Sequence, residues 1–205
     1  MATAIAVIVV LVLLLGAALA VVAARRDGGS GRLRRRFGPE YDLAVAAHDG
    51  DEAAAAEELT HRLDRFGDLR PRPLEPAAAS ALRADWAETQ RRFVDSPPEA
   101  VAAATDLVAW AARLRGYPDA EDGTEAHLAA LSVHHPDRTQ AYRESLALAD
   151  GTGPAADTDA LRAQLLRLRE LFTDLLADAD RPTASKRSPR SLDRLRPGRR
   201  HPASA

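Results

Sequence analysis

An uninterrupted apolar segment at the N-terminus limits what the start of this chain can form. Residues 2–24, ATAIAVIVVLVLLLGAALAVVAA, carry no charged side chain. At about 1.5 Å per residue, a helix of this length is roughly 35 Å long and can cross the roughly 30 Å hydrocarbon core of a bilayer. We therefore predict a transmembrane helix over residues 1–24.

A cleaved secretory signal peptide is the alternative interpretation of this segment. Signal peptides begin with positive charge and have a shorter apolar core. Here no Lys or Arg precedes the apolar run, although Ala18–Ala20 resembles a cleavage site. We favour the uncleaved membrane helix, and the alternative is an exported helical domain.

Charge is strongly segregated along the rest of the chain. Residues 25–36 hold six arginines and one aspartate, a net charge of +5. Residues 37–180 hold 28 acidic residues and 14 arginines, a net charge of −14. The positive-inside rule then predicts a single-pass protein of a bacterial cell membrane with its C-terminal domain in the cytoplasm. The predicted membrane-surface residues of this basic linker are Arg25, Arg26, Arg34, Arg35 and Arg36.

The C-terminal segment, residues 181–205, is a second basic region. It holds eight Lys or Arg residues against Asp193, a net charge of +7, and is rich in Pro and Ser. This composition predicts a disordered tail. Its expected partners are anionic phospholipid headgroups, and the acidic body of the chain is an alternative. Nucleic acid is disfavoured because no aromatic residues lie between the charges to stack on bases.

Apolar spacing and capping signals predict an all-α domain of six or seven helices over residues 37–180, with no period-two strand pattern. The expected helices span residues 39–50, 51–66, 76–94, 97–114, 124–133, 136–149 and 158–175. Ser96 and Glu99 are spaced as a capping box at one N-terminus. The helix over 97–114 is apolar over a wide arc and is predicted to be the central one. Four aromatic residues at helical spacing are predicted to lie in the core: Trp86, Phe93, Trp110 and Phe172.

The last predicted helix carries a stripe of alternating four- and three-residue spacing. Such a stripe can form the seam of a homodimer or face the core of its own domain. It covers barely two heptads, whereas coiled coils need three or more, so we favour the core. The stripe consists of Leu161, Leu165, Leu168, Phe172 and Leu175.

Few residues of this chain suggest a catalytic, cofactor-binding or metal-binding site. The chain has no cysteine, no phosphate-binding glycine loop, no G-x-S-x-G and no H-E-x-x-H motif, so we predict no enzyme, catalytic residue or cofactor. His134, His135 and Asp137, with His127 nearby, are weak candidates for a metal or acid–base site. We favour the alternative that His135 caps a helix opened by Pro136 and that His134 is a turn residue, because adjacent histidines point in different directions.

Several segments together resemble a family of small bacterial, mainly actinobacterial, membrane-anchored or secreted helical proteins that has no assigned activity. The segments occur in order between Leu33 and Leu176: LRRRFGPEYDLAV, RPLEP, WAETQRRFVDSPPEAVAAATDLV, RGYP, LSVHHPD, YRESLALA and LRAQLLRLRELFTDLL. The resemblance implies an N-terminal anchor and a helical domain, with no cofactor or catalytic residue to transfer. His134 stands where the family has an acidic or polar residue, and the basic tail is peculiar to this chain.

These observations favour a scaffold or protein-interaction module at the membrane with an unknown protein partner. The competing hypothesis is a metal-binding regulator or enzyme that uses His134 and His135. The junction RRRFGPEYD (34–42) is predicted to be a hinge between the anchor and the domain, where Gly38 and Pro39 break and restart the helix. Phe37 and Tyr41 are predicted to dock the start of that helix on the body.

Overall fold

The computed structural model describes residues 29–121, 123–153 and 156–177. The predicted membrane helix, Arg25, Arg26 and the basic tail lie outside the described residues. Within the described ranges the chain forms helices and turns and no strand, so the prediction of an all-α domain is confirmed. No helix in these ranges is both long and apolar enough to span a bilayer.

The helices lie close to their predicted positions. Residues 29–37 are helical up to a break at Gly38. Seven further helices follow: α2 (Pro39–Ala47), α3 (Glu52–Phe66), α4 (Pro76–Arg92), α5 (Pro97–Leu114), α6 (Thr124–His134), α7 (Thr139–Ala149) and α8 (Thr158–Leu176).

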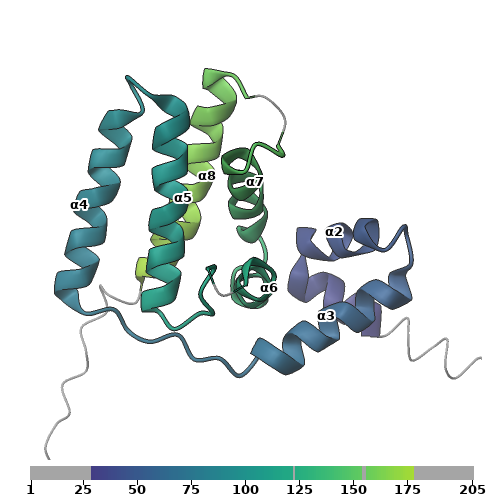
Figure 1. Cartoon of the computed structure of the whole chain (residues 1–205). Coiled ribbons are helices and arrows are strands. Elements are labelled where there is room, and N and C mark those ends of the chain that lie inside the picture. Colours follow the sequence, from purple (N-terminus) through teal and green to yellow (C-terminus); the bar gives the residue numbers. More distant parts are fainter. Residues whose placement is uncertain (1–28, 122, 154–155, 178–205) are drawn as a thin grey trace, which may run out of the picture.

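Helix α5 is at the centre of the larger part of the fold. It packs against α8, α4 and α7, and Figure 1 shows these helices standing side by side with α6 at their base. Helix α3 packs on α2 and on α6, so the hairpin of α2 and α3 is attached to the side of the molecule through α6. The prediction that α5 is the central helix is confirmed.

Two stripes of apolar residues run along α5, and only one of them is buried. Val101, Ala104, Val108 and Ala111 face the core. On the second stripe Leu107 is half-buried, and Trp110 is 45% exposed. The prediction that Trp110 lies in the core is therefore wrong. The reason is geometric: α4 and α7 pack on the flanks of α5, and no described helix covers the face between them.

The heptad stripe of α8 lies in the chain's own core. All five of its residues are buried, and Leu168 is fully so. Phe172 stacks on Trp86 of α4, with ring centroids 4.5 Å apart. Trp86, Phe93 and Phe172 are core residues, as predicted.

Two predicted helix starts are wrong in detail. The Ser96 side chain makes no capping hydrogen bond on α5, so the predicted capping box does not form. Pro136 does not open α7. Instead His135 ends α6, with its backbone N–H donating to the Leu131 carbonyl. The chain then turns, and the Thr139 hydroxyl donates to the His135 carbonyl at the start of α7.

The junction at residues 34–42 is built into the core. Phe37, Glu40 and Tyr41 are all buried, which confirms the docking of Phe37 and Tyr41. Gly38 has a φ of 50°, a conformation that glycine adopts without strain. A Cβ placed there would lie 2.9 Å from Asp137 Oδ1, so the turn after α6 approaches this break closely. These contacts fix the helix over 29–37 to the body.

Candidate functional site

The histidine pair does not form one site. His134 donates from Nε2 to the Phe66 carbonyl at 3.0 Å, whereas His135 Nε2 shares a hydrogen bond of 3.2 Å with the Tyr117 hydroxyl. Asp137 is exposed and lies against Gly38. Among the residues that the structure describes, no group of three or more His, Asp or Glu side chains is arranged to hold a metal ion.

His135 is held as a neutral ring between two loops. Burial lowers the pKa of His135 to about 4, although Asp174 opposes this shift. Its Nδ1 atom is 4.0 Å from Asp174 Oδ2, and Arg138 Nε donates to the same carboxylate oxygen at 2.5 Å. Tyr117 is itself buried, so its hydrogen bond with His135 joins the loops after α5 and α6, and Asp174 of α8 lies at the partly exposed edge of this contact.

A buried carboxylate forms a second cluster, which the sequence did not reveal. Glu40 is 1% exposed and receives two hydrogen bonds from Arg143 of α7, at 2.9 Å and 3.0 Å. Arg62 of α3 lies 3.5 Å from the same carboxylate. Arg62 also donates to Ser132 and Glu58. No local pattern pairs Glu40 with these arginines, because they are 22 and 103 residues away in sequence.

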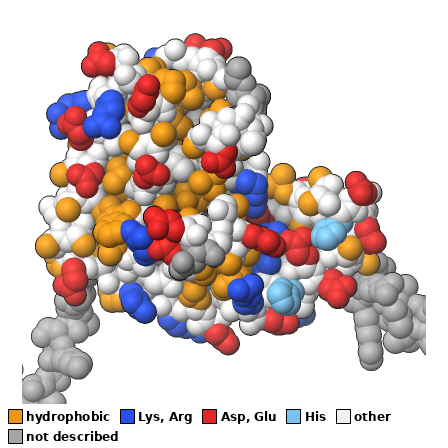
Figure 2. Space-filling view, in the orientation of Figure 1, with side chains coloured by type: hydrophobic (Ala, Val, Ile, Leu, Met, Phe, Trp, Pro, Cys, Tyr) orange, Lys and Arg blue, Asp and Glu red, His pale blue; other side chains and the backbone are white. Residues whose placement is uncertain are grey.

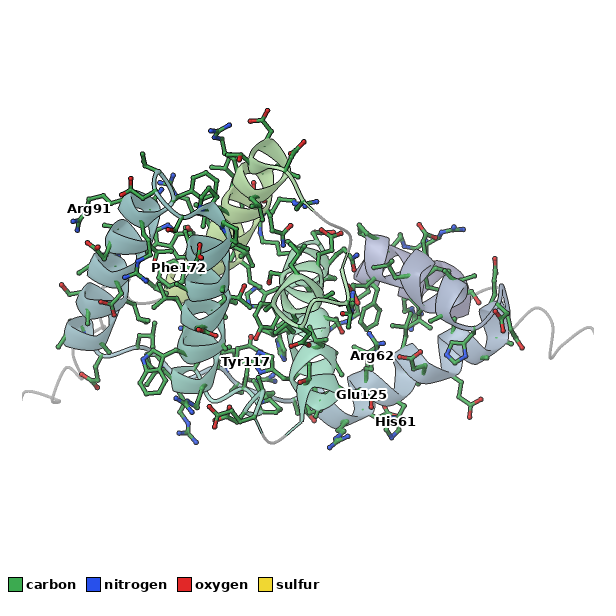
Figure 3. All side chains as sticks on the ribbon, turned by 45° about the horizontal axis from the view of Figure 1, so that its top comes forward. His61, Arg62, Arg91, Tyr117, Glu125 and Phe172 are labelled. Atoms are coloured by element: carbon green, nitrogen blue, oxygen red, sulfur yellow. The ribbon has the colours of Figure 1, made fainter. Side chains whose placement is uncertain are left out.

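The side-chain view shows where this cluster lies. Figure 3 places Arg62 and His61 on α3 beside Glu125 of α6, where the two helices meet. Because Arg62 and Arg143 are both engaged by Glu40, the cluster is internally neutralised and has no free anion-binding group. We therefore assign it the role of joining α2, α3 and α7.

A groove of about 830 Å³ runs along the uncovered face of α5, and we call it the α5 groove. Its floor includes Leu107 and Trp110 from the second stripe of α5. Its walls come from α4, from the loop before α6 and from α7. The lining residues are Asp85, Glu88, Thr89, Arg92, Ala103, Thr105, Asp106, Leu107, Ala109, Trp110, Arg113, Asp119, Ala120, Glu121, Thr124, Tyr142 and Leu146.

The lining of the α5 groove is acidic. It contains five carboxylates and two arginines. One of the arginines, Arg113, lies 4.1 Å from the centre of the Trp110 ring and donates to Asp119 at 3.0 Å. Hydrogen bonds from Arg113 and from the Glu121 backbone lower the pKa of Asp119 below its ordinary value. Figure 2 shows the same face, with exposed hydrophobic side chains over α5 and acidic groups among them.

Tyr142 of α7 contributes a buried polar group to this groove. Its side chain is fully buried, and its hydroxyl has no hydrogen-bond partner within the described residues. Burial, with the charges of Asp106 and Asp119, raises the pKa of Tyr142 above its ordinary value. The hydroxyl is thus a hydrogen-bond donor buried behind the inner wall, with no partner among the described residues. His127 lies behind it, with ring centroids 5.4 Å apart, and donates from Nδ1 to the Pro118 carbonyl at 2.6 Å.

Comparison of the chain with protein-family models, curated proteins and solved structures gave no match. The family resemblance therefore stays a hypothesis, and the α5 groove must be interpreted from its own chemistry.

Proposed function

We propose that this protein is a membrane-tethered interaction module whose α5 groove docks a basic, amphipathic segment of a protein partner. One observation carries the proposal: the central helix of the fold keeps Leu107 and Trp110 accessible inside a rim of carboxylates. Tryptophan in such positions is enriched among the residues that contribute most to binding energy.

The charge of the groove supports a basic partner. Opposite charges across an interface steer association and select among partners. The five carboxylates exceed the two arginines of the lining, and Arg113 is already neutralised by Asp119. A partner with apolar residues for Trp110 and Leu107, flanked by Lys or Arg, matches this surface.

The chemistry of the lining supports binding more than catalysis. No histidine is among the residues that line the α5 groove, so the hydroxyls of its threonines have no histidine beside them to act as a general base. The predicted membrane helix and the +5 basic linker would hold the module at the cytoplasmic face of a bacterial membrane.

Site-specific photocrosslinking of the full chain in native membranes tests this proposal. A photoreactive residue at Leu107 should give a protein adduct of defined mass. The matched control is the same residue at Leu166, which is 53% exposed on the outer face of α8. We expect several-fold more adduct from position 107, and a large loss of it in the Trp110→Ala background. Equal adducts from both positions, or adducts with lipid alone, would contradict the proposal.

The competing hypothesis is a metal-binding regulator that uses His134 and His135. It is disfavoured by the separate partners of the two rings, Phe66 and Tyr117. Calorimetric titration with Zn²⁺ distinguishes the two hypotheses. We expect no zinc-dependent heat and no shift of the melting temperature, and a stoichiometric zinc signal lost in His135→Gln would favour the regulator.

A further inference from the structure

We infer that the protein's own basic tail, residues 181–205, docks in the α5 groove and competes there with the partner. This inference rests on the proposed function, because it takes the α5 groove to be a docking site. It adds the identity of a second occupant and the regulation that follows: the groove becomes available to a partner when the tail leaves it.

Charge complementarity is the first argument. The tail has a net charge of +7, the highest of any segment of the chain. The α5 groove presents an excess of carboxylates, and Asp85 and Asp106 have no basic partner within the described residues. Docking of arginines on these carboxylates would relieve the repulsion among them, an effect that salt weakens.

The tail also carries the apolar groups that this groove requires. Leu192 and Leu195 are its only leucines, and they lie three residues apart among Arg190, Arg194 and Arg196. A short amphipathic segment of this kind can place the leucines on Leu107 and Trp110 while the arginines reach the rim. The tail thus has the same chemistry that we propose for the partner.

The connection is long enough for this contact. Helix α8 ends at Leu176 and packs on α5, the helix that forms the floor of the groove. The 15 residues from Ala177 to Ser191 can span up to about 46 Å from the first to the last when extended, whereas α5 is only about 27 Å long. A tether of this length sets an effective concentration on the order of millimolar, so even a weak contact is populated.

A disulfide-trapping experiment tests the contact directly. The chain contains no cysteine, so two engineered cysteines are its only thiols. The full chain is placed in nanodiscs of zwitterionic phosphatidylcholine with Ser191→Cys and Leu107→Cys. The matched control pairs Ser191→Cys with Leu166→Cys on the outer face of α8. Equilibration in a glutathione redox buffer gives the effective molarity of each pair.

We expect the effective molarity of the Leu107 pair to exceed that of the control pair at least tenfold. The excess should fall several-fold in 0.5 M salt and in the combined Asp85→Asn and Asp106→Asn background. Equal effective molarities for the two pairs would overturn the inference. Ala103→Cys, on the same stripe, provides a second groove position if Leu107→Cys disturbs the fold as judged by circular dichroism.

The same experiment separates this inference from the proposed function. If the tail shows no preference for the groove while photocrosslinking at position 107 still captures a partner, the tail inference fails and the proposed function stands. If the tail docks but no partner is captured, the proposed function fails and the groove is a docking site for the tail. When both are correct, deletion of residues 181–205 should raise the partner adduct at position 107 several-fold. Nanodiscs with anionic lipid should reduce the excess without abolishing it, because the leaflet then competes for the same arginines.

Discussion

At the scale of single residues, one buried charge depends on two partners from distant helices. Glu40 lies in the interior with Arg143 and Arg62 as partners. A buried ion pair adds little net stability compared with apolar residues of the same size. Removal of one partner is costly because it leaves the other charge buried and uncompensated.

Glu40→Gln should therefore destabilise the fold by about 2–3 kcal/mol, somewhat below the cost for fully buried pairs. The reduction reflects Arg143, whose side chain is 34% exposed and partly solvated. Denaturant unfolding of the full chain in detergent micelles measures the change. Asp42→Asn is the control, because the Asp42 pair with Arg34 is exposed and its loss should leave the unfolding midpoint nearly unchanged. A Glu40→Gln variant as stable as the control would contradict this account.

The buried histidines make stability depend on pH. The pKa of His135 falls from 6.5 to about 4 through burial, and burial also lowers the pKa values of His127 and His134. The unfolded chain therefore binds protons that the folded chain does not. The free energy of unfolding should fall as pH drops from 6.5 to about 4.

The slope of that fall counts the protons taken up on unfolding. We expect His135→Gln to reduce this count by about one between pH 6.5 and 4, because His127 and His134 still contribute. Equilibrium unfolding at several pH values gives the slope. An unchanged slope in His135→Gln would show that His135 is protonated in the folded domain.

At the scale of elements, α5 and α8 divide their apolar residues differently. The stripe of α8 is committed to the core, while α5 buries one stripe and leaves part of the other in the α5 groove. A large stability effect is therefore expected on α8, and a binding effect with little loss of stability on the exposed stripe of α5.

Leu168→Ala should cost about 2–5 kcal/mol, since it removes a fully buried side chain and leaves a cavity. Leu166→Ala on the exposed face of the same helix should cost less than about 0.5 kcal/mol. Both variants are compared by thermal unfolding, with sedimentation to record the oligomeric state. The interpretation of the stripe as core fails if Leu168→Ala changes association while leaving stability intact.

At the scale of the whole molecule, the junction over residues 34–42 is part of the folded body. Phe37 is fully buried and belongs to the same core as Trp86 and Phe172. The hinge interpretation treats residues 34–42 as a flexible joint, whereas these contacts predict that the helix over 29–37 unfolds together with the rest.

Phe37→Ala should lower the stability of the entire domain by about 3–5 kcal/mol. Unfolding is followed by tryptophan fluorescence in a Trp110→Phe background, so that the signal comes from Trp86, which is buried between α4 and α8. Arg35→Ala, at an exposed position on the same helix, is the control. A hinge would leave the Trp86 transition at its original midpoint in Phe37→Ala.

The helices and the α8 core stripe could be predicted from the sequence because they depend on local spacing. Proline at the first turn, glycine after the last turn and apolar residues every three or four positions act within one helix. Segregation of charge into a basic linker, an acidic body and a basic tail was likewise determined by the sequence alone.

Only the tertiary structure decided which apolar stripe of α5 stays open and which carboxylate is buried. Trp110 has the same helical spacing as Phe93 and Phe172, and its exposure depends on where α4 and α7 pack. Glu40 pairs with Arg143, which is 103 residues away in sequence, and no local pattern predicts this pair. Both outcomes depend on how helices that are distant in sequence pack against one another. The spacing of residues along one helix does not contain this information.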